Sequence, residues 1–186
     1  YYAGKLKERE QLVGNLAKHC GVYCAYVNLV GGQDELVFDG ASMVVSPEGK
    51  MIAQARQFEE DLLVTDIELD KTDDRSNKIF ISSNTLSYVK PDSAQHPVDK
   101  LDEIGEIFQA LVLGTRDYVR KCGFSKVLIA LSGGIDSSLV AAIAAEALGP
   151  QNVVAVFMPS KFSSKQSEVD AIELSRNLQI EYKTIS

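Results

Sequence analysis

The second half of the chain alternates apolar runs with helical segments, and this alternation restricts the possible folds more than any other feature of the sequence. The apolar runs are KVLIAL, NVVAVFM and IEYKTI, at residues 126–131, 152–158 and 180–185. Residues 138–148 and 166–178 separate these runs and have the composition of helices. Continuous apolar runs joined by helices are typical of parallel strands that are covered on both faces. The pattern therefore predicts a doubly wound α/β domain with a parallel sheet.

A glycine-serine loop, SGGIDS, joins the first of these strands to the first helix. Ligands of such sheets bind at the carboxyl ends of the strands, where this loop lies. Gly133 and Gly134 carry no Cβ atom, so their backbone N–H groups can approach an anion closely. The next helix adds its positive N-terminal end, and the hydroxyls of Ser132, Ser137 and Ser138 add further donors. The loop is therefore expected to bind phosphate groups.

Asp136 stands inside this loop, where a bare carboxylate would repel phosphate. Its presence is explained if a magnesium ion lies between the carboxylate and the phosphate oxygens. The loop lacks the Gly-Lys-Ser/Thr ending of the common nucleotide loop and the G-x-G-x-x-G pattern of dinucleotide sites. The sequence therefore predicts a metal–nucleotide site of another class. The alternative is a plain strand-to-helix turn in which Asp136 caps the helix.

The first part of the chain predicts one helix followed by several strands. Residues 5–19 carry apolar side chains at helical spacing and end before Gly21. Residues 22–30, residues 42–55 on either side of a Pro-Glu-Gly turn, and residues 61–69 are rich in apolar and β-branched side chains. Each of these three segments is expected to contribute strands.

A polar segment at residues 70–100 follows, and it is expected to be a linker. Beyond it, residues 101–122 predict a long helix that Gly123 terminates. The spacing predicts that one face of this helix is buried, and that face comprises Ile104, Phe108, Leu111, Val112, Thr115 and Val119.

The charge balance and the cysteine content exclude several classes of partner. The net charge is -7 and the Lys and Arg residues are scattered, so neither nucleic acid nor an anionic membrane surface is expected as a partner. No apolar run reaches the length of a membrane span. Cys20, Cys24 and Cys122 are too few for a disulfide framework and fit a reducing cytoplasm. Because the chain starts without Met and ends within a strand pattern, we expect a fragment cut at both ends.

Four sequence stretches carry a family resemblance. SGGIDS resembles the signature of the ATP pyrophosphatase superfamily. DEIGEIFQALVLGTRDYVRKCGF and MPSKFSS on either side of it, and YVNLVGGQDELVFDG in the first part, are similar to glutamine-dependent NAD synthetases. The resemblance covers nearly the whole chain in the order of that family. It implies that residues 1–70 are the C-terminal part of a nitrilase-like α/β sandwich with glutaminase activity, residues 71–100 a linker, and residues 101–186 the first part of an adenine nucleotide alpha hydrolase-like ATP-binding domain.

This resemblance implies an enzyme that makes NAD from deamido-NAD with ATP and Mg²⁺. The nicotinate carboxylate would attack the α-phosphate of ATP, and ammonia released from glutamine would then displace AMP from the acyl adenylate. The implied partners are small molecules, namely deamido-NAD, ATP and glutamine or ammonia, and further copies of the chain in a homo-oligomer. Two alternatives stay open: another amidotransferase of the ATP pyrophosphatase type, and a nucleotide-binding domain without catalysis.

The resemblance also assigns roles to individual residues. Asp136 would bind magnesium, and Met158 would lie against the adenine unless it is an ordinary core residue. Lys5 would contact the bound glutamine unless it is a solvated lysine at a helix start. The glutaminase Glu, Lys and Cys are expected before Tyr1, so this chain alone is expected to be inactive. The implied ATP-binding residues are Ala130, Ser132, Gly133, Gly134, Ile135, Asp136, Ser137, Ser138 and Met158.

Four other side chains of the first part could react but receive no catalytic role. Cys20 and Cys24 have no base at a motif spacing, and buried structural cysteine is the commoner state. Asp34 and Glu35 could act as acid-base carboxylates, although a pair that holds a turn explains them equally well.

Overall fold

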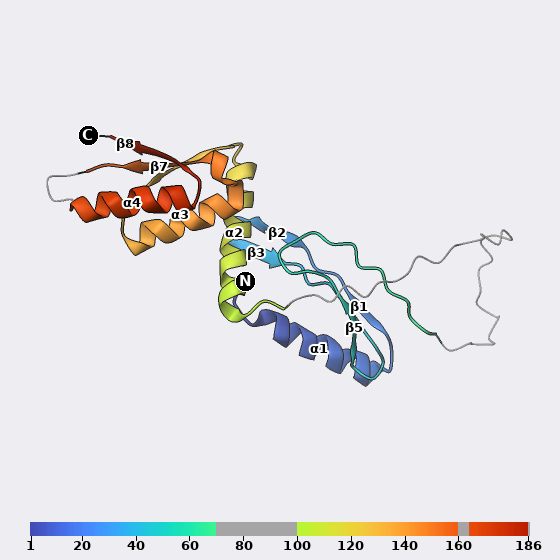
Figure 1. The fold of residues 1–186 in the computed structure, drawn as a ribbon. Helices are drawn as coiled ribbons and strands as arrows, with labels where there is room; N and C mark the ends of the chain where they lie inside the picture. The colour runs from blue at the N-terminus through green and yellow to red at the C-terminus, as the bar shows by residue number, and fades with distance from the viewer. Residues whose placement is uncertain (70–99, 160–163, 186) are drawn as a thin grey trace.

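The computed structural model describes residues 1–69, 100–159 and 164–185, and these form two units (Figure 1). The first unit runs from the chain start through the strands drawn in blue and teal, and the second begins at α2, Glu103–Lys121, drawn in lime. Helix α2 also contacts β2 and β3 of the first unit, and in Figure 1 it lies between the first unit and the rest of the second. The predicted linker lies outside the described residues, except for its last residue, Lys100.

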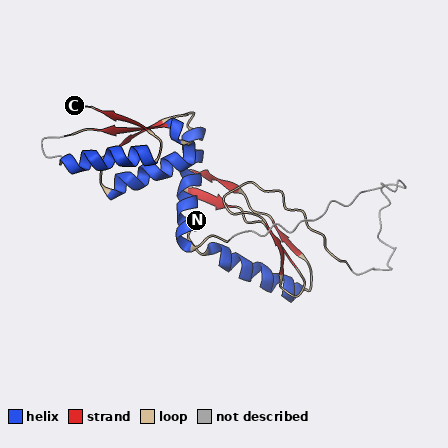
Figure 2. Ribbon diagram, in the orientation of Figure 1, coloured by secondary structure: helices blue, strands red, loops and turns tan. Residues whose placement is uncertain are grey.

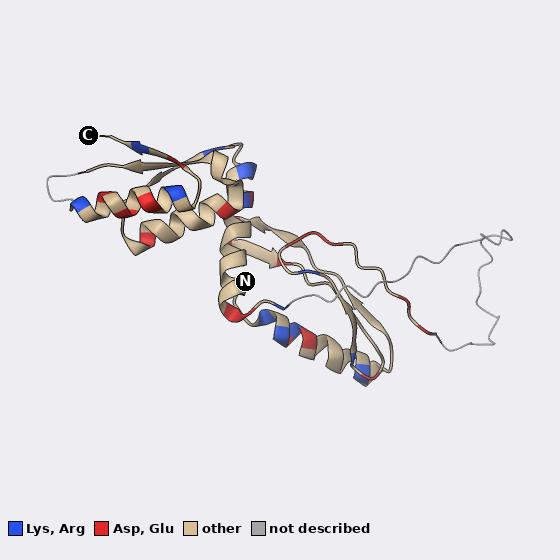
Figure 3. Ribbon diagram, viewed as in Figure 1, with Lys and Arg blue, Asp and Glu red and all other residues tan. Residues whose placement is uncertain are grey.

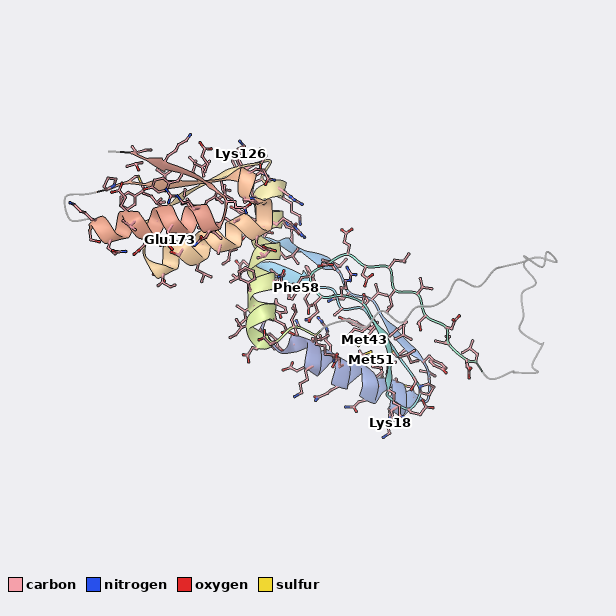
Figure 4. All side chains as sticks on the ribbon, viewed as in Figure 1. Lys18, Met43, Met51, Phe58, Lys126 and Glu173 are labelled. Carbon is pink, nitrogen blue, oxygen red and sulfur yellow. The ribbon has the colours of Figure 1, made fainter. Side chains whose placement is uncertain are left out.

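In the first unit, α1, Lys5–Cys20, packs on a small antiparallel sheet. The sheet has the order β1-β4-β5, formed by β1 (Cys24–Tyr26), β4 (Met43–Val45) and β5 (Met51–Gln54). The predicted helix and the predicted hairpin around the Pro-Glu-Gly turn are both confirmed. Figure 4 shows Met43 between α1 and the strands. The buried cluster that joins helix to sheet comprises Leu6, Val13, Ala17, Ala41, Met43 and Val45.

One strand prediction in this unit is confirmed only in part, and another is wrong. Residues 22–30 contribute β1 and the first residue of β2, but they do not form one strand, because the chain leaves the sheet after β1 and enters a separate antiparallel hairpin of β2, Val30–Gln33, and β3, Leu36–Asp39. Residues 61–69 contain no strand, and Leu62 is 85% exposed. A strand needs a neighbour to complete its hydrogen bonds, and no described strand lies beside residues 61–69 to serve as one.

The second unit contains the predicted parallel sheet. Its strands β6 (Val127–Ala130), β7 (Val153–Phe157) and β8 (Glu181–Thr184) are paired in chain order. The crossovers are α3, Ile135–Leu148, followed by the short 3-10 turn η1 at Pro150–Asn152, and α4, Lys165–Asn177. The α/β class and the parallel pairing are therefore confirmed.

Within the described residues, both crossover helices cover the same face of this sheet, as Figure 2 shows. This follows from the strand order, because right-handed crossovers that advance in one direction place their helices on one side. On the covered face, Ile129, Ala155 and Phe157 pack against both helices. On the other face Leu128 is 76% exposed, so the described residues do not provide the second helical layer that the sequence predicts.

Helix α2 buries two faces rather than the single one predicted. Phe108, Val112 and Val119 pack against the end of α3 as expected. Ile104, however, is 77% exposed, and the buried residues Ala110 and Leu113 instead pack against Phe58 of the first unit. Figure 4 shows Phe58 beside α2. The helix therefore contacts both units, which a single-face reading of the sequence does not reveal.

Candidate functional site

The loop after β6 is held in shape by its own serines. Ser132 Oγ accepts a hydrogen bond from the Gly134 N–H at 3.2 Å and lies 3.0 Å from Ser137 Oγ. The hydroxyls of Ser137 and Ser138 donate to the Gly134 carbonyl oxygen at 3.0 and 2.8 Å. The first N–H groups of α3 have no intrahelical acceptor, as at every helix start. The hydroxyls therefore shape the loop, and the backbone N–H groups of the first helical turn are the donors available to an anion.

Gly133 is the loop position whose backbone requires glycine. Its φ is 80°, and a Cβ atom there would lie 2.3 Å from the Ser167 carbonyl oxygen. Gly134 has a φ of -86°, which any residue adopts, and a Cβ atom there would meet Ser132 Oγ at 3.3 Å. The sequence argument treated the two glycines alike. The structure shows that protein geometry requires glycine at 133 and does not require it at 134.

The carboxylate of Asp136 is exposed in the first turn of α3. Gly134 is the N-cap of α3 and there is no side-chain cap hydrogen bond, so the capping alternative for Asp136 is wrong. The described residues contain no group of three or more His, Cys, Asp or Glu side chains that could hold a metal ion. Magnesium commonly binds through one or two carboxylates together with phosphate oxygens, so a single free carboxylate beside a phosphate loop fits its donor requirements.

Ala130, Ser132 and Met158 line one pocket at the carboxyl ends of β6 and β7. The pocket has a volume of about 110 Å³, and Leu131, Val156 and Phe157 complete its wall. Met158 is 58% exposed, so it lies outside the core that the described residues form. The structure thus brings together residues that the sequence placed 28 positions apart, counting from 130 to 158.

The start of α4 also borders the loop, and it follows directly on the MPSKFSS stretch that carries the family resemblance. Ser164 is the N-cap of this helix, and its hydroxyl accepts a hydrogen bond from the Ser167 N–H at 3.0 Å. The close approach of Gly133 to the Ser167 carbonyl places the first turn of α4 against the loop. The sequence predicted this helix at residues 166–178, and in the structure it begins one residue earlier, at Lys165.

Lys5 lies in the other unit and is the first residue of α1. It follows Gly4, which has a left-handed backbone with a φ of 82°. Its ammonium lies 5.6 Å from the centre of the Tyr2 ring, a cation–π contact. Figure 1 shows the chain start at the foot of α2, away from the α3 and α4 crossovers. The glutamine and nucleotide residues expected from the sequence are therefore in separate places, one in each unit.

The GGQDELVFDG stretch forms the β2–β3 hairpin. Asp34 and Glu35 form its two-residue turn, and Asp34 has a φ of 51° and accepts a hydrogen bond from Gln33 Nε2 at 3.2 Å. These contacts agree with the turn alternative for the two carboxylates. Cys20 and Cys24 are free thiols, exposed and partly exposed respectively.

A buried ion pair at the end of β3 was not predicted. Arg9 binds Asp39 through Nη1–Oδ1 at 2.6 Å and Nη2–Oδ2 at 2.7 Å, and the Asp39 side chain is only 2% exposed. Asn28 Nδ2 adds a hydrogen bond to Asp39 at 3.1 Å. Burial acts to lower the pKa of Arg9, but the hydrogen bonds and charge of Asp39 outweigh it and raise that pKa. The pair joins α1 to β3, and the charged group of Arg9 compensates the buried carboxylate of Asp39.

Acidic and basic residues are interspersed along the helices of both units (Figure 3). Among the residues described, none of the helices combines the length and apolar character needed to cross a membrane.

Two protein-family models match the chain, one for each unit. The carbon-nitrogen hydrolase family matches residues 7–75, and the NAD synthase family matches residues 107–186.

Relatives of known name match both parts together. A glutamine-dependent NAD(+) synthetase of Aquifex aeolicus is 44% identical over 199 residues, covering 100% of this chain and 35% of the relative. The enzyme of the same name from Synechocystis is 45% identical over 185 residues, covering 100% and 30%. A solved glutamine-dependent NAD+ synthetase of Acinetobacter baumannii in complex with adenosine diphosphate has a TM-score of 0.79 and 38% identity, covering 99% of this chain and 32% of that one. The chain therefore spans about a third of the length of these relatives.

Proposed function

We propose that this chain, which belongs to the family of glutamine-dependent NAD(+) synthetases, is the junction segment of an enzyme that amidates deamido-NAD to NAD. In this proposal residues 1–70 belong to the ammonia-producing domain, residues 71–100 link the domains, and residues 101–186 begin the ATP-using domain. The observation that carries it is the loop after β6, which combines a shaped Ser-Gly-Gly turn, an exposed carboxylate and a helix start next to one pocket. The named relatives and the two family matches support the same division.

In the proposed reaction the carboxylate of deamido-NAD attacks the α-phosphorus of ATP, and the bond to the β-phosphate breaks. Pyrophosphate leaves with its electron pair, and an acyl adenylate forms. Ammonia then attacks the acyl carbon, AMP departs, and one proton is lost to give the amide of NAD. Charge accumulates on the leaving pyrophosphate in the first step, so groups that stabilise negative charge lower that barrier.

The residues of the loop supply such groups. Gly133 allows the left-handed turn that precedes α3, and the first N–H groups of this helix can donate to the pyrophosphate oxygens. The carboxylate of Asp136 would hold Mg²⁺, which when bound supplies positive charge to the phosphate oxygens. Met158 offers an exposed thioether and methyl group beside Ala130, a suitable apolar contact for an adenine ring.

In the first domain Lys5 is proposed to contact glutamine, and ammonia is the only species that passes to the second domain. The substrates would be deamido-NAD, ATP and glutamine or ammonia, and the enzyme would act as a homo-oligomer in the cytoplasm. The three cysteines are free thiols, which suits a reducing compartment.

The experiment that tests this proposal follows AMP, pyrophosphate and NAD in the full-length protein that contains this segment. We expect all three to appear in equal amounts when deamido-NAD, ATP, Mg²⁺ and either glutamine or ammonium chloride are supplied. Asp136→Asn should retain the fold, because the Asp136 side chain does not cap α3, but it should lose Mg²⁺-dependent AMP formation. AMP formation without deamido-NAD, or wild-type rates in Asp136→Asn, would contradict the proposal.

A further inference from the structure

A buried carboxylate from α2 receives hydrogen bonds from three residues of the first unit, two at the chain start and one after β5. Glu106 is 7% exposed. Its Oε2 accepts from the Tyr1 hydroxyl and from the Gly4 N–H, each at 2.9 Å. Its Oε1 accepts from Gln57 Nε2 at 3.1 Å. Figure 3 shows acidic residues at this end of α2, next to the chain start.

None of these donors carries a charge, and Glu106 forms no ion pair among the described residues. A buried carboxylate is costly unless strong hydrogen bonds compensate for the lost water. An ionised acceptor makes hydrogen bonds that are roughly twice as strong as neutral ones, so each donor is held firmly. An aliphatic side chain at this position would leave the Tyr1 hydroxyl and the Gly4 N–H without their acceptor.

The Gly4 contact matters because α1 lacks a local cap. Gly4 is the N-cap of this helix, and no side chain caps it. Its left-handed backbone, with a φ of 82°, turns the chain directly before Lys5. A backbone hydrogen bond from the Lys5 N–H to the Tyr2 carbonyl oxygen, at 3.4 Å, also spans this turn. The acceptor of the Gly4 N–H is Glu106, which lies 102 positions away and in the other unit.

We infer that Glu106 is a positioning residue for Lys5, and that it sets the affinity for glutamine from the ATP-using side of the protein. The inference rests on the proposed function, in which Lys5 contacts glutamine. Glu106 does not touch the substrate in this scheme. Glu106 accepts the hydrogen bond of the Gly4 N–H, and the turn at Gly4 positions Lys5. If this turn loosens, the Lys5 ammonium can move away from the bound glutamine.

Helix α2 offers a matched control at its other end. Asp117 Oδ2 accepts a hydrogen bond from the Gly32 N–H at 2.7 Å, which also joins the two units. It lies eleven residues after Glu106, about 16 Å along a helix, and it holds the β2–β3 hairpin rather than the Gly4 turn. A variant at Asp117 therefore weakens the contact between units without acting on Lys5.

The test measures NAD formation by the full-length protein with glutamine and, separately, with saturating ammonium chloride. We expect Glu106→Ala to raise the KM for glutamine about tenfold or more, because a hydrogen bond to a charged group is lost. The kcat of the ammonia-driven reaction should stay within about twofold of the wild-type value. Glu106→Gln keeps an acceptor for Gly4, so its KM for glutamine should rise by only about threefold. Asp117→Ala should leave the KM for glutamine at its wild-type value.

Equal losses with both nitrogen sources in Glu106→Ala would overturn the inference, and so would a KM increase in Asp117→Ala as large as that in Glu106→Ala. If Glu106→Ala does not fold, an unchanged KM for glutamine in Glu106→Gln overturns it instead. Lys5→Ala separates this inference from the proposed function. If Lys5→Ala leaves the KM for glutamine unchanged, the role proposed for Lys5 is wrong. If Lys5→Ala raises this KM but the Glu106 variants do not, only the role inferred for Glu106 is wrong.

Discussion

The backbone N–H of Gly32 donates a 2.7 Å hydrogen bond to Asp117 Oδ2, and this contact joins residues 85 positions apart in the two units. Lys121 strengthens the same junction by donating to the Gly32 carbonyl oxygen and, at 3.1 Å, to Gln33 Oε1. The hairpin and α2 can approach this closely because Gly32 and Gly114 face each other and neither has a side chain. A Cβ atom on Gly32 would lie 3.0 Å from the Cα of Gly114.

The first prediction concerns this close approach. Gly32→Ala should lower the free energy of unfolding of the chain by about 1–3 kcal/mol, because the added methyl meets backbone that cannot move aside. Gly114→Ala is the matched control in the same interface. Its Cβ would meet a side-chain methyl, Val37 Cγ2, at 3.3 Å instead of backbone, and alanine favours a helix over glycine by up to about 1 kcal/mol. Urea unfolding of both variants checks this, and equal destabilisation by the two would contradict the close-packing argument.

The second prediction separates the two glycines of the phosphate loop. Gly133→Ala should destabilise the chain by about 2–4 kcal/mol, the sum of a left-handed backbone and a clash with the Ser167 carbonyl. Gly134→Ala should change stability by about 1 kcal/mol or less, since its backbone is already extended. Thermal unfolding distinguishes the two. If phosphate approaches the backbone at Gly134, calorimetric titration of the full-length protein should show weaker binding of Mg²⁺-ATP to Gly134→Ala. A wild-type affinity in this variant would show that Gly134 is not part of the ATP site.

The third prediction concerns pH. Burial, the hydrogen bond to Glu106 and the charge of that carboxylate raise the pKa of the Tyr1 hydroxyl above its ordinary value of 10.0. The unfolded chain then loses this proton first as the pH rises, so the neutral hydroxyl stabilises the fold fully below about pH 10 and progressively less above it. Tyr1→Phe removes the group, so the stability of this variant should fall less steeply above pH 10 than that of the wild type. The check is the free energy of unfolding in urea, measured for both proteins from pH 8 to 11. If it changes with pH to the same extent in Tyr1→Phe and in the wild type, the Tyr1 hydroxyl does not stabilise the fold by this hydrogen bond.

The fourth prediction concerns the end of α4. Gln179 has a left-handed φ of 58°, and its N–H donates to the Arg176 carbonyl while the Ile180 N–H donates to that of Ser175. This is the hydrogen-bond pattern of a helix terminus that favours glycine. Gln179→Gly should stabilise the chain by about 0.5–1 kcal/mol, because removal of the Cβ strain exceeds the entropy that glycine loses. Gln179→Ala retains the Cβ atom and serves as the control. A gain of equal size in both variants would point to the lost side chain instead of the backbone.

Much of each unit could be predicted locally. The helix at 5–19, the hairpin at 42–55 and the parallel strands with their helices all follow from periodicity, because neighbouring residues decide which local backbone buries their apolar side chains. The phosphate loop also lies where the pattern placed it, between β6 and α3. The same local evidence failed at residues 61–69, where the side chains suit a strand but the described residues provide no partner for it.

What only the tertiary structure decided is how distant segments meet. Phe58 is 3% exposed with a left-handed φ of 59°, and its ring lies 5.5 Å from that of Tyr1 in an edge-on contact beside α2. No local pattern predicts such a conformation for phenylalanine. The strain is compensated by packing against the chain start, the β2–β3 hairpin and α2.

The sequence by itself therefore determined the elements, their order and the chemical character of the loop, all of which depend on residues close together in the chain. The tertiary structure decided that Gly133 rather than Gly134 requires glycine, that α2 buries two faces, and that Glu106 holds the turn before Lys5. These features arise from contacts between residues that are distant in the chain, such as Gly133 and Ser167 or Gly4 and Glu106. Their energy appears only when the chain is folded, since hydrogen bonding and close packing act between atoms that are neighbours in space.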